Sequence, residues 1–83
     1  MEKYILMIKE LVEHIVKQLV NDPDQVGISI TQDGNKSTVE IRVSDRDRGR
    51  LIGKNGRTIK AVRTIVDVVV PVNQKILVNI APK

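Results

Sequence analysis

The sequence has no cysteine and only one histidine among its 83 residues. Without thiols, disulfide bonds and thiolate metal sites are excluded, and one histidine excludes a histidine-rich metal site. Aromatic side chains are nearly absent, since a single tyrosine is accompanied by no phenylalanine and no tryptophan. We therefore expect an aliphatic core and a protein that binds no metal and no cofactor.

Long apolar runs are also missing. A membrane-spanning helix needs roughly 18 consecutive apolar residues, and charges interrupt the apolar residues of the N-terminal MEKYILMIKE, unlike a signal peptide. We expect a cytoplasmic protein. A chain of 83 residues, 41% of them hydrophobic, predicts one small domain over residues 1–83 that places its apolar side chains in a single core.

Groups suited to catalysis do not come together in the sequence. His14 falls on the polar side of a predicted helix, as a surface residue would. No Ser-His-Asp set is present, because this one histidine lies in a different element with no matched acid. Asp67 stands alone, and Asp45 and Asp47 are better explained as residues near a helix N-cap at Ser44. We expect no enzymatic activity.

The apolar pattern divides the chain into six elements. A period near 3.6 predicts a helix over residues 3–20, and a period of two predicts strands over 26–31 and 38–43, joined as a hairpin by DGNK. A capping box begins a short helix from Ser44 to about Ile52, and a further helix runs from near Arg57 until Pro71 ends it. Alternation in QKILVNIA predicts a last strand.

These elements give the order α-β-β-α-α-β. The apolar side of the first helix is predicted to hold Ile5, Ile8, Val12, Ile15, Val16 and Leu19, and that of the last helix Ile59, Val62, Ile65, Val66 and Val69. We predict an α+β domain of two layers, with three helices on one face of a three-stranded mixed sheet. The long connection through two helices allows the last strand to lie parallel to a neighbour.

Positive charge is concentrated in residues 46–63. This segment holds seven basic residues and one acidic residue, a net charge of +6, whereas the whole chain carries +4. A solvated helical face is one explanation. A surface that attracts the phosphates of a nucleic acid is the other, and the concentration of the charge favours it.

The centre of the basic segment is the tetrapeptide Gly53-Lys54-Asn55-Gly56. Glycine permits positive φ and close approach of another backbone, and the following helix N-terminus offers free N–H groups to an anion. The P-loop spacing G-x-x-x-x-G-K-[ST] and the dinucleotide pattern G-x-G-x-x-G are both absent. Taken alone, the turn is equally consistent with a tight connection between two helices.

The stretch LIGKNGRTIKAVR resembles the signature of the KH domain, a hydrophobic residue followed by I-G-x-x-G-x-x-I-K. The element order resembles the type II, or prokaryotic, KH arrangement, and the short chain resembles the bacterial single-KH proteins of the KhpA family. The resemblance implies that the GxxG loop clamps the backbone of four nucleotides of single-stranded RNA. It further implies an RNA chaperone that pairs with a larger KH protein, KhpB, and is linked to cell shape and cell-wall biogenesis.

We therefore expect a non-catalytic protein that binds single-stranded RNA and acts in post-transcriptional regulation. The alternative is a protein-interaction module whose KH fold supports a homodimer or a complex with a KhpB-like protein, through the first helix or an unpaired sheet edge. Neither a membrane nor a small-molecule substrate is expected as a partner. The predicted RNA-binding residues are Gly53, Lys54, Asn55, Gly56, Arg50, Ile52, Arg57, Ile59, Lys60 and Arg63.

Overall fold

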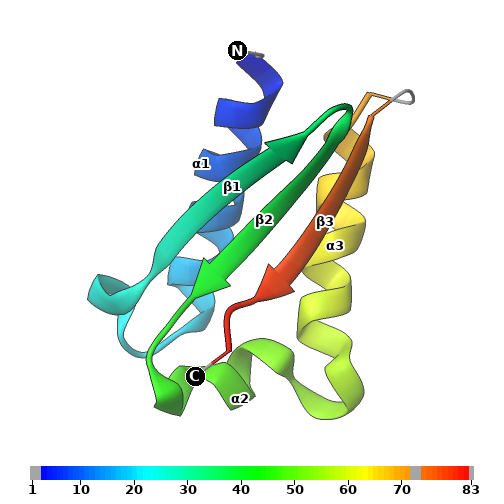
Figure 1. The fold of residues 1–83 in the computed structure, drawn as a ribbon. Helices are drawn as coiled ribbons and strands as arrows, with labels where there is room; N and C mark the ends of the chain where they lie inside the picture. The colour runs from blue at the N-terminus through cyan, green and yellow to red at the C-terminus, as the bar shows by residue number, and fades with distance from the viewer. Residues whose placement is uncertain (1–2, 72–73, 83) are drawn as a thin grey trace.

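The computed structural model describes residues 3–71 and 74–82. Its helices are α1 (Lys3–Leu19), α2 (Asp45–Ile52) and α3 (Arg57–Val69), and its strands are β1 (Gly27–Asp33), β2 (Lys36–Arg42) and β3 (Lys75–Ile80). Two 3-10 turns, η1 (Pro23–Gln25) and η2 (Lys54–Gly56), complete the chain. The order α-β-β-α-α-β is confirmed (Figure 1).

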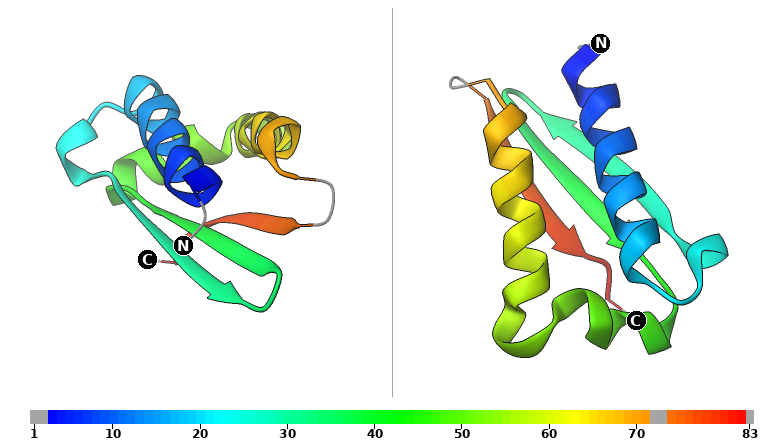
Figure 2. Two further views of the ribbon diagram at one scale, coloured as in Figure 1. Left: turned by 90° about the horizontal axis from the view of Figure 1, so that it is seen from above. Right: turned by 180° about the vertical axis from the view of Figure 1, so that it is seen from behind.

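The three strands form one mixed sheet in the order β1-β2-β3. β1 and β2 are antiparallel and are joined by a two-residue turn at Gly34 and Asn35, whereas β3 lies parallel to β2 with Val78 opposite Val39. All three helices cover the same face of this sheet, and the other face is open (Figure 2). The predicted two-layer fold and the parallel last strand are therefore both confirmed.

The core lies between the helices and the covered face of the sheet. The side chains of Ile8, Val12 and Val16 on α1 and of Val39 and Ile41 on β2 have no exposed surface. Leu51, Val62 and Val66 complete this centre from α2 and α3. The core is aliphatic, as the near absence of aromatic residues predicts, and each helix contributes the residues that its 3.6-residue period places on one side.

Two residues assigned to the apolar sides are exposed, and Ile15 and Val69 are partly buried. Leu19 is 37% exposed and Ile65 is 42% exposed. Leu19 is the last residue of α1, so no following turn of helix shields it. Ile65 lies about 100° around the helix from the buried Val66, which turns its side chain away from the sheet.

The ends of the elements differ from the predictions by one or two residues. The hairpin strands extend to Asp33 and begin again at Lys36, so the turn is shorter than the predicted DGNK. α3 ends at Val69, and Val70 is extended because Pro71 disfavours helical backbone in the residue that precedes it. Among the described residues, no helix combines the length and the apolar character required to cross a membrane.

Candidate nucleic-acid interface

The turn between α2 and α3 has an unusual backbone. Gly53, Asn55 and Gly56 all have positive φ, at 76°, 58° and 75° respectively. Asn55 is the one described residue other than glycine with positive φ, and asparagine adopts this left-handed conformation more readily than most side chains. Three left-handed residues out of four reverse the chain sharply, so that α3 begins immediately after α2 ends.

Position 53 requires glycine for two reasons, its backbone angles and the lack of space for a side chain. Its ψ of 175° places it in a region that is essentially restricted to glycine. A Cβ atom built at this position would also collide with the Thr58 side chain and would lie 2.9 Å from the Thr58 backbone nitrogen. At Gly56 the nearest such contact is 4.0 Å away. Gly53 therefore allows the turn to fold back against the first turn of α3.

The N-terminus of α3 is open to a ligand. Gly56 occupies its N-cap and has no side chain to accept a hydrogen bond, so the first N–H groups of the helix have no side-chain cap. Lys54 and Asn55 are exposed on η2 directly beside this end. The Arg57 N–H already donates to the Lys54 carbonyl. The N–H groups without a side-chain cap, the helix dipole and an ammonium group together favour an anion such as a phosphate.

A buried carboxylate fixes the start of α2. Asp47 is 1% exposed, and its two oxygens accept hydrogen bonds from the backbone nitrogens of Asn21 (3.0 Å) and Asp22 (2.9 Å). Ser44 donates its hydroxyl to the same carboxylate at 3.1 Å, and its Oγ accepts from the Asp47 nitrogen as the predicted N-cap. The hydrogen bond from the Asn21 N–H is the largest of the effects that lower the pKa of the Asp47 carboxyl. Asp47 therefore ties the segment after α1 to the helix that leads into the turn.

A hollow of about 500 Å³ opens beside the turn, between the two helices and the end of β3. Its apolar part includes Ile52, which is 38% exposed, and Ile59, which is 6% exposed and also belongs to the core. The full lining consists of Glu40, Arg48, Ile52, Ile59, Arg63, Asn79, Ile80 and Pro82. The structure thus brings the predicted residues Ile52, Ile59 and Arg63 together at one surface.

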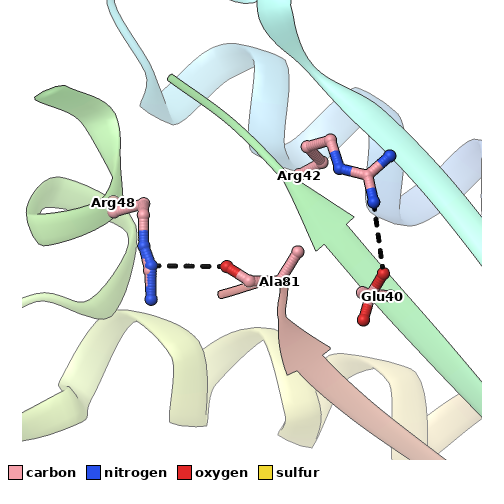
Figure 3. Close-up of polar contacts among 4 residues, drawn as sticks. All are labelled: Glu40, Arg42, Arg48 and Ala81. Atoms are coloured by element: carbon pink, nitrogen blue, oxygen red, sulfur yellow. Dashed lines mark hydrogen bonds and ion pairs between the residues drawn. The ribbon is translucent and has the colours of Figure 1, made fainter. Parts of the chain in front are cut away.

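Two arginines connect the helices to β3 and to Ala81, the residue after it, across this hollow. Arg48 of α2 donates from Nη1 to the Ala81 carbonyl at 3.3 Å, as Figure 3 shows, next to the Glu40–Arg42 pair of β2. Arg63 of α3 donates from Nε to the Val78 carbonyl at 2.9 Å. Each hydrogen bond fixes one N–H of a guanidinium group on a backbone carbonyl at the edge of the hollow. The carbonyl thereby orients the other N–H groups of that arginine.

The other predicted basic residues lie on the same segment. Arg50, Arg57 and Lys60 are exposed, but they do not line the hollow. The ion pairs Lys17–Glu13 and Arg42–Glu40 belong to other elements and use none of these side chains. The basic segment therefore has exposed positive charge on both sides of the turn.

Sequence reasoning missed the contribution of β3 to this surface. Asn79 and Ile80 line the hollow because β3 is the edge strand next to α3, and the sheet order that decides this has no local sequence signal. Arg48 was counted in the basic segment without a separate role. Arg48 lies four residues before Ile52, on the same side of a helix, and this spacing is the signal that could have placed Arg48 beside Ile52 in the site.

No group of three or more histidine, aspartate or glutamate side chains within residues 3–71 and 74–82 is arranged to hold a metal ion. The arrangement instead offers backbone N–H groups, positive charge and an aliphatic surface. Such a surface suits a phosphodiester chain with its bases turned toward the hollow.

Comparison with known proteins decides the family. The family model of the KhpA/KhpB KH domain matches residues 9–80, which include the whole of the turn and every residue that lines the hollow except Pro82. The chain belongs to the KhpA/KhpB KH-domain family. The resemblance seen in the sequence is therefore confirmed, and the matched residues include the turn formed by Gly53, Lys54, Asn55 and Gly56.

Relatives in this KH family are named as RNA-binding proteins. The chain is 48% identical to RNA-binding protein KhpA of Halalkalibacterium halodurans over 58 residues, which cover 70% of this chain and 76% of that protein. It is 41% identical to RNA-binding protein KhpA of Clostridium perfringens over 73 residues, which cover 87% and 97% respectively. RNA binding is thus the activity that the names of these relatives give.

A solved structure shares the fold. It is Era in complex with MgGDPNP and nucleotides 1506–1542 of 16S ribosomal RNA, with a TM-score of 0.57 and 20% sequence identity. The match covers 94% of this chain and 32% of the Era chain. At this identity the similarity supports the type II KH architecture alone.

Proposed function

We propose that this KH domain binds single-stranded RNA without catalysis, holding the RNA backbone at the GKNG loop and the bases at the adjoining hollow. The observation that carries the proposal is the conformation of Gly53, which turns the chain so that Lys54 and Asn55 stand at the uncapped N-terminus of α3. Phosphates approach this end, and bases contact Ile52 and Ile59 on the same side of the turn.

The composition of the site sets the strength of binding. Charge neutralisation of phosphates supplies most of the affinity and makes it sensitive to salt. Many single-strand binders stack bases on aromatic rings, whereas this hollow offers isoleucine side chains. A loop that clamps about four nucleotides, next to an aliphatic surface, gives weak binding with modest base preference.

The test is the double substitution Lys54→Asp and Asn55→Asp. Aspartate tolerates the left-handed backbone of Asn55, so the turn is expected to fold. The hairpin turn provides a matched control, because Asn35→Asp and Lys36→Asp make the same chemical changes at exposed positions. That turn lies at the opposite end of the sheet from α2 and the GKNG loop (Figure 1).

Affinity is measured by fluorescence anisotropy with a short labelled single-stranded RNA at low salt. We expect the loop variant to lose at least tenfold in affinity, while the hairpin variant loses much less because its charges lie far from the RNA. Equal losses in the two variants would mean that net charge alone attracts RNA. Unchanged affinity in the loop variant would refute the clamp.

The proposal extends to the cellular role. As a cytoplasmic RNA chaperone, the protein would promote annealing of complementary RNAs without ATP, which a strand-annealing assay with the loop variant measures directly. As a post-transcriptional regulator paired with a KhpB-like protein, it would affect transcripts for cell shape and cell-wall biogenesis. Crosslinking and sequencing of bound RNAs, with and without that partner, tests this part: an absence of such transcripts contradicts it.

A further inference from the structure

One acidic side chain lies in a hollow whose other charged residues are basic. Glu40 of β2 lines the hollow beside the GKNG loop together with Arg48 and Arg63. The residue that pairs with Glu40 in β3 is Asn79, which lines the same hollow. A carboxylate repels phosphate, so Glu40 is unsuited to hold the RNA backbone. The other contact that an RNA strand offers, and the one that carries sequence information, is the edge of a base.

A surface ion pair with Arg42 does not account for the whole of the Glu40 carboxylate. Oε1 of Glu40 lies 3.6 Å from Nη2 of Arg42, which is longer than a hydrogen bond. The side chain of Glu40 is 42% exposed and that of Arg42 is 68% exposed, and an exposed pair of this kind adds little stability. Arg42 therefore orients the carboxylate without occupying its acceptor sites, of which an ionised carboxylate has about four.

A donor group faces the same space from α2. Arg48 and Glu40 lie on either side of Ala81 (Figure 3). Nη1 of Arg48 donates to the Ala81 carbonyl at 3.3 Å, which holds the guanidinium group in place. This hydrogen bond does not use Nε and Nη2, which form a fork of two parallel N–H donors. The hollow thus contains a paired acceptor in Glu40 and a paired donor in Arg48.

The four RNA bases differ in how well they match these two pairs. Guanine has two acceptors, N7 and O6, on one edge, and it has the donors N1–H and N2–H on the next edge. Proteins read both of these edges in single-stranded RNA. Adenine and cytosine each offer a carboxylate one amino group, and the N–H of uracil lies between two carbonyl oxygens. Guanine is therefore the base that matches both the acceptor pair and the donor pair.

We propose that the hollow selects guanine, with Glu40 accepting hydrogen bonds from N1–H and N2–H and the Arg48 fork donating to O6 and N7. Arginine bound to O6 and N7 is the commonest specific contact between a protein and a base. The inference rests on the proposed function, because it names the base that is held beside the GKNG loop. A bidentate pair of this kind discriminates against a wrong base by roughly fivefold or more.

Modified bases test each edge of guanine separately. The unmodified chain is titrated at low salt, by fluorescence anisotropy, with a labelled oligouridine and with the same RNA carrying one central guanosine, adenosine or cytidine. Inosine lacks the N2 amino group and 7-deazaguanosine lacks the N7 acceptor, so each removes one of the proposed hydrogen bonds. We expect guanosine to bind roughly fivefold or more tightly than the other three bases, and each modified base to lose most of this preference.

Two glutamate variants separate base selection from charge. Glu40→Gln keeps the size of the side chain but replaces one acceptor oxygen by an amide donor. Glu13→Gln is the matched control, because Glu13 of α1 also pairs with a basic side chain, Lys17, and its side chain is 39% exposed. Both changes remove one negative charge, so the readout is the ratio of guanosine to inosine affinity. We expect Glu40→Gln to bring this ratio close to one and Glu13→Gln to preserve it.

A third variant tests the donor fork. Arg48→Lys keeps the positive charge but removes the paired N–H groups. We expect it to abolish the difference in affinity between guanosine and 7-deazaguanosine, and an unchanged difference overturns the role of Arg48.

The outcomes distinguish guanine selection from RNA binding itself. Equal affinity for the four bases, in a chain whose RNA binding the GKNG loop variant weakens, overturns guanine selection and leaves the proposed function standing. A preference for another base also overturns it. If Glu40→Gln leaves the ratio of guanosine to inosine affinity unchanged, Glu40 acts on RNA through its charge alone and the proposal is wrong. Failure of every RNA to bind the unmodified chain overturns both proposals.

Discussion

Three glycines within eight residues have different structural requirements, and substitution of each by alanine tests the geometry of the GKNG loop. Gly49 lies inside α2, and a Cβ there meets nothing within 4 Å. Replacing a helical glycine by alanine removes backbone freedom from the unfolded chain, so Gly49→Ala is expected to stabilise the fold by about 0.5–1 kcal/mol.

Gly56 and Gly53 are expected to respond in the opposite direction. At Gly56 alanine would be held in the left-handed region with adequate space, which costs about 1 kcal/mol. At Gly53 the cost of the glycine-only backbone region, roughly 1–3 kcal/mol, adds to the collision with Thr58, which includes its backbone nitrogen. We expect Gly53→Ala to destabilise the domain by about 3 kcal/mol, a large part of the roughly 5–15 kcal/mol that stabilises a typical domain.

Urea denaturation followed by circular dichroism measures all three variants. The expected order of midpoints is Gly49→Ala above the unmodified chain, then Gly56→Ala, then Gly53→Ala. Adding Thr58→Ala to Gly53→Ala removes the Oγ1 contact but leaves the Cβ and backbone contacts, so it is expected to recover part of the loss. If Gly53→Ala lowers the urea midpoint no more than Gly56→Ala does, the inference that the turn lies close against Thr58 is wrong.

Three further predictions follow from individual side chains. Hydrogen bonds led by the Asn21 N–H hold the pKa of Asp47 below its unfolded value of about 3.9. Their stabilisation is therefore present above about pH 4 and is lost as pH falls through the folded-state pKa; the urea midpoint of the unmodified chain should fall across this range more steeply than that of Asp47→Asn. If Arg57 contacts one phosphate, Arg57→Ala should reduce the slope of log affinity against log salt by about 0.7, and an unchanged slope would contradict that contact. Ile52→Ala should weaken RNA binding with little change in stability, whereas Ile59→Ala should cost about 2–5 kcal/mol of stability because Ile59 is 6% exposed.

Local signals in the sequence were sufficient for most of the fold. The alternation around Val39 and Ile41 predicted a strand with one buried side, and both side chains are fully buried. Ser44 was predicted to cap α2, and its Oγ accepts the Asp47 N–H. These features depend on residues close together in the chain, so their periods and spacings report them.

The GKNG loop was predicted as a unit, but its surroundings were not. Gly53 and Gly56 were expected to allow positive φ, and both have it. Asp47 was expected to cap a helix, yet its carboxylate also accepts backbone N–H groups from Asn21 and Asp22. This contact joins residues 25 and 26 positions apart, and no local pattern specifies which distant donors meet a buried acid.

The sequence by itself determined the elements, the aliphatic core, the concentration of positive charge and the glycine loop. Each of these depends on composition or on the spacing of neighbouring residues. Tertiary structure decided that β3 lies at an edge next to α3 and that β1 is the other edge. It also decided that Arg63 binds a carbonyl of β3 and that Arg48 binds the carbonyl of Ala81, the residue after β3. Strand order is set by the packing of the helices against the sheet, and this packing brings together residues that are far apart in the chain.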